Sequence, residues 1–187
     1  LTDGSGNASI STTLSVTVAA GAFISATATI STRSYTSFSD TSEFARSVVA
    51  ISTVQNTLVV TTAADTTDGD TSSLSTLLAN KGADGFISLR EALIAINNTP
   101  AGSLPTLVNF GIAGSGVHTI TLGSALPAIV RPVVIDGTTD TASVTANGGR
   151  PAIVLNGNGL GDHGLTLTST AGGSTIRGLV VRNFFGA

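Results

Sequence analysis

The chain has 187 residues, a length that fits one domain of ordinary size or two small ones, and its net charge of −3 with eight scattered basic residues argues against nucleic-acid binding. Hydrophobic residues make up 41% of the chain and charged residues 10%, and this composition with 22 glycines is typical of a β-rich protein. The absence of cysteine excludes a disulfide framework and cysteine-based metal sites, and no apolar run approaches the roughly 18 residues of a membrane span.

The N-terminal segment alternates apolar and polar residues, as a half-buried strand does. This alternation predicts strands over 8–18, 22–31 and 43–51, with a polar hairpin tip at 32–42 between the last two. A complete immunoglobulin-like sandwich has about seven strands, so three strands make at most half of one. We therefore predict a partial antiparallel β-sandwich over 1–52, whose apolar face is covered by strands outside this chain or by another element.

This segment resembles the small immunoglobulin-like β-sandwich that often follows a repetitive β-domain in large bacterial surface proteins. The resemblance is carried by residues 3–8 (Asp-Gly-Ser-Gly-Asn-Ala), 22–29 and 41–44. The connection between the last two strands is longer here than in that pattern. The resemblance implies an extracellular or cell-surface location.

The densest acidic cluster of the chain follows a strand predicted at 58–62 and consists of Asp65, Asp68 and Asp70. Closely spaced carboxylates in a loop suit a hard cation such as Ca²⁺, although this spacing does not match the EF-hand loop. A weak calcium site and a solvated acidic turn are the two interpretations, and we expect no other cofactor. Residues 71–86 are predicted to be loop.

Residues 88–98 carry the one convincing helical period of the sequence. Ser88 and Glu91 form a capping box, in which each side chain accepts a hydrogen bond from a backbone N–H at the helix start. Either Asn97 or Asn98 is expected to end the helix in the left-handed conformation. The apolar stripe consists of Leu89, Ala92, Leu93 and Ile96. We expect this helix to cover the open end of the strands that follow it.

Arg90 lies in the first turn of the predicted helix, where a cation opposes the helix macrodipole. This position predicts an acidic partner, either Asp84 or one of the carboxylates between Asp65 and Asp70. The expected role of the pair is structural.

Short apolar strands separated by glycine and asparagine turns fill the rest of the chain. They are predicted at 107–110, 117–122, 132–136, 152–156, 164–168 and 175–181. Such strands indicate either a solenoid, in which each coil packs on the next, or flat antiparallel hairpins. The loops are mostly too long for two-residue hairpin turns, which favours the solenoid.

Residues 58–187 resemble the start of right-handed parallel β-helix proteins that carry a Leu-Arg-Glu-Ala (CSLREA-type) N-terminal motif. The matching segments are 62–70, 88–93, 119–122, 126–129, 134–137 and 174–179, with Phe86-Ile87 where the motif has its cysteine. The expected fold is therefore all-β: the N-terminal cap and first coils of a right-handed parallel β-helix over 53–187, with one short capping helix, preceded by the partial antiparallel β-sandwich.

Parallel β-helices host polysaccharide lyases and hydrolases, which use clustered or paired carboxylates. The residues that qualify by type are Asp136, Asp140, Asp162, His163, Arg177 and Arg182. Asp136 belongs to an Asp-Gly turn, where its side chain binds the local backbone. Asp162 lies in a glycine-rich turn with no second carboxylate near it in sequence. We therefore expect turn residues here and predict no catalytic residue.

Low charge, richness in serine and threonine and the lack of an evident site favour an extracellular structural or cell-surface protein, such as a unit of a fibre, filament or adhesin. The alternatives are a fragment of a carbohydrate-active β-helix enzyme and a sugar-binding module. Exposed aromatic residues are typical of sugar-binding modules, but the chain has seven Phe, one Tyr and no Trp.

The last residues, 182–187, end in or just after a predicted strand, with no polar capping helix behind it. Unpaired strand edges are normally covered. We therefore expect the partners to be copies of the chain or further domains of the same polypeptide, arranged head to tail, with surface polysaccharide as a further candidate.

Overall fold

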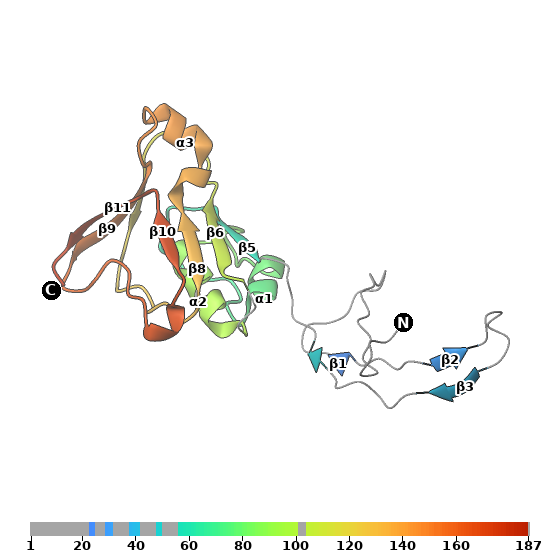
Figure 1. The fold of residues 1–187 in the computed structure, drawn as a ribbon. Coiled ribbons are helices and arrows are strands. Elements are labelled where there is room, and N and C mark those ends of the chain that lie inside the picture. The colour runs from blue at the N-terminus through green and yellow to red at the C-terminus, as the bar shows by residue number, and fades with distance from the viewer. Residues whose placement is uncertain are drawn as a thin grey trace. The chain divides into compact units, whose positions relative to one another are not determined.

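The computed structural model describes residues 56–100 and 104–186, together with the backbone of four short strands that precede them. Those four strands are Phe23–Ile24 (β1), Thr29–Ser31 (β2), Phe38–Thr41 (β3) and Val48–Val49 (β4). The chain divides into two compact units, Leu1–Ser52 and Thr53–Ala187 (Figure 1).

The strands of the first unit form two separate antiparallel pairs, β1 with β4 and β2 with β3. The expected partial sandwich is therefore wrong, because the described strands are two to four residues long and build no facing sheets. Part of the segment predicted as a hairpin tip is strand β3 instead. The strand predicted over 8–18 lies outside the described residues.

The second unit contains two parallel sheets. Its strands are Thr57–Val60 (β5), Thr106–Phe110 (β6), His118–Thr121 (β7), Val133–Asp136 (β8), Ile153–Leu160 (β9), Thr175–Arg177 (β10) and Leu179–Phe184 (β11). One sheet has the order β10-β8-β6-β5 and the other the order β11-β9-β7 (Figure 1). Every strand pair in both sheets is parallel, so the hairpin interpretation is wrong.

Helices are inserted between these strands. They are Leu74–Ala79 (α1), Leu89–Asn98 (α2) and Thr141–Ala146 (α3), with single 3₁₀ turns at Gly137–Thr139 (η1) and Ser169–Ala171 (η2). The unit is therefore a mixed α/β structure of two open parallel sheets, and the predicted all-β right-handed parallel β-helix is wrong. A solenoid needs neighbouring coils of like construction. Here two helices separate β5 from β6, and none separates β6 from β7.

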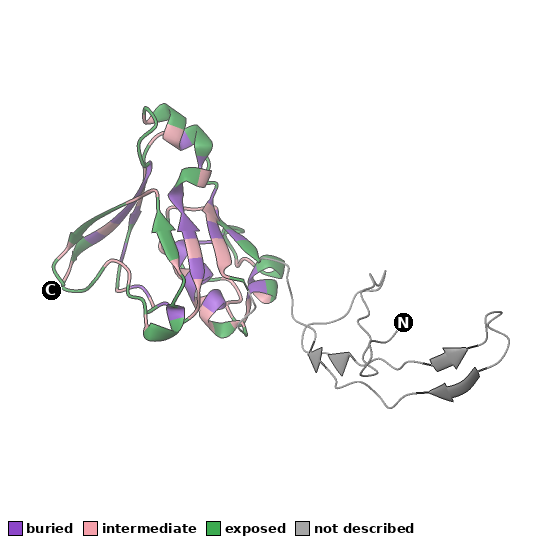
Figure 2. Ribbon diagram, viewed as in Figure 1, coloured by how far each residue is buried: buried purple, intermediate pink, exposed green. Residues whose placement is uncertain are grey.

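The core lies between the sheets and under helix α2 (Figure 2). The predicted helix is confirmed, with Ser88 as N-cap and the capping box to Glu91 in place. It ends at Asn98, as predicted, but the predicted left-handed ending is wrong, because the C-cap is Thr99 in an extended conformation and neither Asn97 nor Asn98 has a positive φ. The largest fully buried side chains are Leu58, Leu77, Ile87, Leu89, Leu93, Ile120, Leu122, Ile129, Ile135, Ile153, Leu155 and Glu91.

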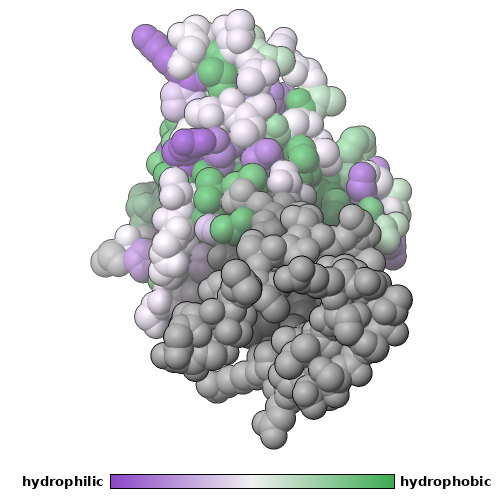
Figure 3. Space-filling view, turned by 45° about the vertical axis from the view of Figure 1, so that its right-hand side comes forward, coloured by the Kyte–Doolittle hydropathy of each residue, from purple (hydrophilic) through white to green (hydrophobic). Residues whose placement is uncertain are grey.

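The surface carries little charge. On the face shown in Figure 3, hydrophilic and hydrophobic residues lie interspersed among residues of intermediate hydropathy. This distribution agrees with a chain that has few charged residues and many small hydroxyl side chains. None of the helices within 56–100 and 104–186 is long and apolar enough to cross a membrane.

Adding a methyl group at Gly137 is expected to destabilise the second unit. Gly137 follows β8, and a Cβ there would meet the backbone carbonyl oxygen of Gly178, which follows β10. Because backbone cannot move aside as a side chain does, Gly137→Ala should cost about 1–3 kcal/mol. The matched control is Gly161→Ala, since a Cβ at Gly161 meets no atom within 4 Å. Urea unfolding of both variants checks this, and equal stabilities would contradict the close contact between β8 and β10.

Candidate functional site

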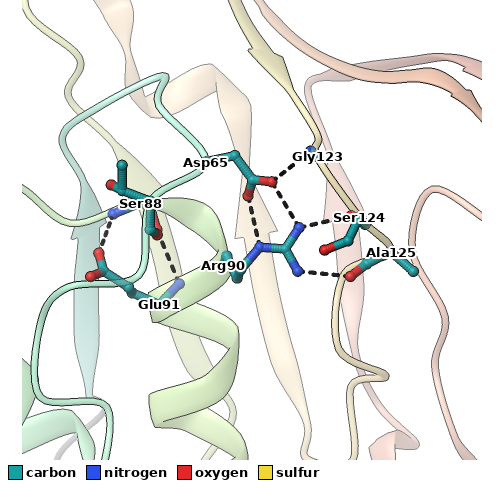
Figure 4. A network of polar contacts seen from close by, with 8 residues as sticks. Asp65, Ser88, Arg90, Glu91, Gly123, Ser124 and Ala125 are labelled. Atoms are coloured by element: carbon teal, nitrogen blue, oxygen red, sulfur yellow. Dashed lines mark hydrogen bonds and ion pairs between the residues drawn. The ribbon is translucent and has the colours of Figure 1, made fainter.

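Arg90 and Asp65 form an ion pair in the second unit, and both side chains are nearly buried (Figure 4). Nε and Nη2 of Arg90 donate to the two carboxylate oxygens of Asp65 at 2.9 and 2.8 Å. The guanidinium also donates to the carbonyl oxygens of Ser124 and Ala125, and the N–H of Gly123 donates to Asp65. The predicted acidic partner of Arg90 is thus confirmed. The pair fastens helix α2 and the loop after β5 to the segment that follows β7.

Glu91 ties the same loop to the start of helix α2. Its carboxylate accepts hydrogen bonds from the backbone N–H groups of Asp68, Gly69 and Ser88 at 2.8–2.9 Å. The hydroxyl of Ser88 accepts from the N–H of Glu91 and donates to the carbonyl oxygen of Thr66. Glu91 is fully buried, and its carboxylate oxygens find their hydrogen-bond partners in three backbone N–H groups at the N-terminal end of the helix.

The three carboxylates of the proposed calcium loop point to different partners. Asp65 is held by Arg90, as described above. Asp68 accepts from the N–H groups of Ala83 and Asp84. Asp70 accepts from the N–H and hydroxyl of Ser72, and these hydrogen bonds lower the pKa of the Asp70 carboxyl. Within 56–100 and 104–186, no three His, Cys, Asp or Glu side chains gather in a way that holds a metal ion.

Calcium binding by Asp65, Asp68 and Asp70 stays a prediction. An ion that binds the native state and not the unfolded state raises the melting temperature by mass action. The measurement is thermal unfolding of the chain in EDTA and in millimolar Ca²⁺. A higher Tm with Ca²⁺ would support the site, and identical Tm values would remove it.

Asp136 is a turn residue, as its Asp-Gly sequence predicts. Its carboxylate accepts from the N–H and hydroxyl of Thr138 and forms an ion pair with Arg177. The pair joins β8 to the neighbouring strand β10. The hydrogen bond from Arg177 is the main cause that holds the pKa of Asp136 below its ordinary value of 3.8, with Thr138 adding to it.

Acid is therefore expected to weaken this link between β8 and β10. A carboxyl whose pKa is lower in the folded than in the unfolded state contributes stability above the unfolded pKa and loses it as pH falls through the folded pKa. The free energy of unfolding should fall as pH is lowered below 3.8. The Asp136→Asn variant, compared by urea unfolding over the same pH series, should lose less stability in acid. An equal loss in both proteins would contradict the assignment.

The other carboxylates singled out from the sequence do not meet. Asp140 caps helix α3 by accepting from the N–H of Ser143, and its second oxygen accepts from Ile112. Asp162 is exposed and accepts from the N–H of the neighbouring His163. The candidate residues thus occupy separate places, and no paired carboxylates of the kind that cleaves glycosidic bonds are formed among them.

One constellation was missed from the sequence: His118 on β7 lies beside Ser143 and Asp140. Nε2 of His118 is 2.9 Å from the hydroxyl of Ser143 and 3.8 Å from a carboxylate oxygen of Asp140. In a nucleophilic triad the acid binds the ring nitrogen opposite the one that faces serine, whereas here both groups face the same nitrogen. Ser143 is also fully buried and cannot reach a substrate. The cluster therefore anchors helix α3 to β7.

A small cavity lies at the end of helix α2. It holds about 20 Å³, enough for about one water molecule. Arg131 is one of the residues that line this cavity, and its Nε is buried and has no hydrogen-bond partner in the part of the chain that the structure describes. The lining residues are Asn56, Ile96, Thr99, Pro100, Leu104, Thr106, Arg131 and Pro132. A cavity of this size does not hold a sugar.

Comparison of the chain with protein families, with curated proteins and with solved structures finds no match in any of the three. No family is therefore shown for it.

Proposed function

We propose that this chain is an extracellular structural or cell-surface module without catalysis of its own. The observation that supports the proposal is that the described carboxylates bind backbone N–H groups of the chain itself. Within 56–100 and 104–186, every acidic side chain accepts a hydrogen bond from at least one backbone N–H. These side chains are Asp65, Asp68, Asp70, Asp84, Glu91, Asp136, Asp140 and Asp162.

A catalytic carboxylate needs an accessible oxygen and a pKa suited to proton transfer or nucleophilic attack. The carboxylates here stabilise turns, helix caps and the ion pairs that join elements. The contact between Ser143 and His118, which is the serine–histidine contact found within 56–100 and 104–186, is closed to solvent by the burial of Ser143. The extracellular location rests on the low charge and on the richness in serine, threonine and glycine.

The experiment is an activity assay of the whole chain on pectin, alginate and neutral polysaccharides, with and without Ca²⁺. We expect no reducing ends and no unsaturated products above the level of buffer. Product release that is abolished by Asp162→Asn, the substitution of the exposed carboxylate, would overturn the proposal. Asp162→Asn should also leave the Tm unchanged, which shows that any lost activity does not come from unfolding.

A further inference from the structure

Three asparagines of the chain are followed directly by glycine: Asn147, Asn156 and Asn158. An Asn-Gly pair can react with itself, because the backbone nitrogen of glycine attacks the side-chain carbonyl carbon of asparagine with no glycine side chain in the way. The reaction needs an asparagine side chain and a glycine N–H that are both free to move. The hydrogen bonds of each pair therefore decide which of the three reacts in the folded chain.

The side chain of Asn156 is held from three directions. Its oxygen accepts from the amide of Asn183 at 2.8 Å and from the N–H of Asn158 at 3.2 Å. Its NH₂ group donates to the hydroxyl of Thr121 at 3.4 Å. Gly157 is buried and packed so closely that a Cβ there would collide with the backbone oxygen of Asn183. Neither reacting group of this pair is therefore free to approach the other.

The reacting groups of the pair at Asn147 are both hydrogen-bonded. The NH₂ group of Asn147 donates to the carbonyl oxygen of Pro151 at 2.9 Å. The N–H of Gly148, which carries the attacking nitrogen, donates to the carbonyl oxygen of Thr145 at 3.1 Å. Both hydrogen bonds have to break before the nitrogen can attack.

Asn158 and Gly159 lack these restraints. Both residues are exposed, and the side chain of Asn158 makes no hydrogen bond with any residue that the structure describes. The pairing of β9 with β11 passes over them, because the paired residues of β9 on either side are Asn156 and Leu160. Outside that pairing, the N–H of Gly159 makes no hydrogen bond with a described residue. The attacked side chain and the attacking nitrogen are therefore both free.

We propose that Asn158 is a site of spontaneous covalent modification, at which the folded chain deamidates in preference to Asn147 and Asn156. The backbone nitrogen of Gly159 loses its proton and forms a bond to the side-chain carbonyl carbon of Asn158, and the side-chain amide leaves as ammonia. Water then opens the succinimide ring at either carbonyl, which gives aspartate or isoaspartate. Water is the co-reactant, and no oxidant or reductant is needed. The site goes beyond the proposed function and does not depend on it.

The modification changes the end of strand β9. Both products carry a new negative charge. Isoaspartate also lengthens the backbone by a methylene group, because the main chain then runs through the former side chain. On either side of Asn158, Asn156 pairs with Arg182 and Leu160 pairs with Phe184. A longer backbone between the two pairs cannot keep both in register, so the contact between β9 and β11 is expected to loosen beyond Asn158.

The test incubates the whole 187-residue chain in mildly alkaline buffer and locates the loss of ammonia by tandem mass spectrometry of its fragments. We expect Asn158 to react at least about tenfold faster than Asn147 and Asn156, because each hydrogen bond that must break first adds to the barrier. In urea the three pairs should react at similar rates, since the contacts that hold two of them are lost. Equal rates in the folded chain would overturn the proposal. A folded chain that stays unmodified while the unfolded chain reacts would overturn it too.

Asn158→Gly is the matched variant, since Asn158 has a φ of 51°, which glycine adopts readily, and circular dichroism checks that the variant folds. It should abolish the fast release of ammonia, and fast release that persists would contradict the assignment. The control Asn147→Gly should release ammonia as fast as the wild type does. Hydrogen exchange tests the consequence for β11: the N–H of Phe185, which donates to the carbonyl oxygen of Leu160, should exchange faster in the modified chain. Unchanged exchange would overturn the expected loosening.

Discussion

Replacing Glu91 with alanine is expected to have the largest effect of any single substitution in helix α2 and in the loop between β5 and α1. The substitution leaves the backbone N–H groups of Asp68, Gly69 and Ser88 without their acceptor in a site where Glu91 is fully buried. An unsatisfied buried donor costs about 1–3 kcal/mol, and the N–H groups of Asp68 and Gly69 are only partly buried, so the loss of the three hydrogen bonds together should lower the free energy of unfolding by about 3–4 kcal/mol. Urea unfolding measures it.

Glu91→Gln is the matched comparison, because glutamine has nearly the same shape and keeps one acceptor oxygen. That oxygen serves either the Ser88 N–H or the pair at Asp68 and Gly69, while the NH₂ group meets a donor on the other side. Its cost should fall between those of wild type and Glu91→Ala. Equal stability of wild type and Glu91→Ala would show that the carboxylate does not hold the loop.

The parts of the fold that the sequence predicts well are those set by neighbouring residues. The helix start at Ser88 follows from a capping box, whose two partners are three residues apart. The acidic partner of Arg90 follows from the unfavourable position of a cation in the first helical turn. The loop residues bound by Glu91 did not follow from the sequence, because they lie 22 and 23 residues away and nothing local marks them.

The fold class was wrong because the segments between the strands were read as turns. Helix α1 lies in a segment predicted to be loop, and its six residues are too few to show an apolar period. Local signals were present, since Ser73 caps α1 and Asp140 caps α3 through their side chains. Strands with alternating apolar residues look alike in a solenoid and in open parallel sheets. The helices between them decide the class, and those were the weaker signals.

The candidate site shows the same limit. Asp65, Asp68 and Asp70 are close in sequence, but their partners in the structure could not be predicted from it: Arg90 binds Asp65, and backbone amides bind Asp68 and Asp70. Conversely, His118 and Ser143 meet although they are 25 residues apart. Spacing therefore predicts a site only where one regular element carries all its residues, as helix α2 carries the capping box.

Removing the guanidinium of Arg90 is the second change with a large expected effect. Arg90 and Asp65 are 13% and 10% exposed, so Arg90→Ala leaves a nearly buried carboxylate whose one remaining donor is the N–H of Gly123. Breaking a buried pair by deleting one partner costs about 3–5 kcal/mol, and the slight exposure of this pair places the expected loss near the lower end, about 3 kcal/mol. The carbonyl oxygens of Ser124 and Ala125 lose a donor as well.

Two comparisons separate geometry from charge. Arg90→Lys keeps the charge but not the planar fork that binds both oxygens of Asp65, so it should recover part of the loss and not all of it. Arg150→Ala removes an exposed arginine and should stay within about 0.5 kcal/mol of wild type. In a double-mutant cycle, adding Asp65→Ala to Arg90→Ala should cost little more than Arg90→Ala alone, because the deleted carboxylate is the one left uncompensated. Additive costs would mean that the two side chains act independently. The link between helix α2 and the segment after β7 would then come from the separate contacts of Arg90 and Asp65 with the backbone of residues 123–125.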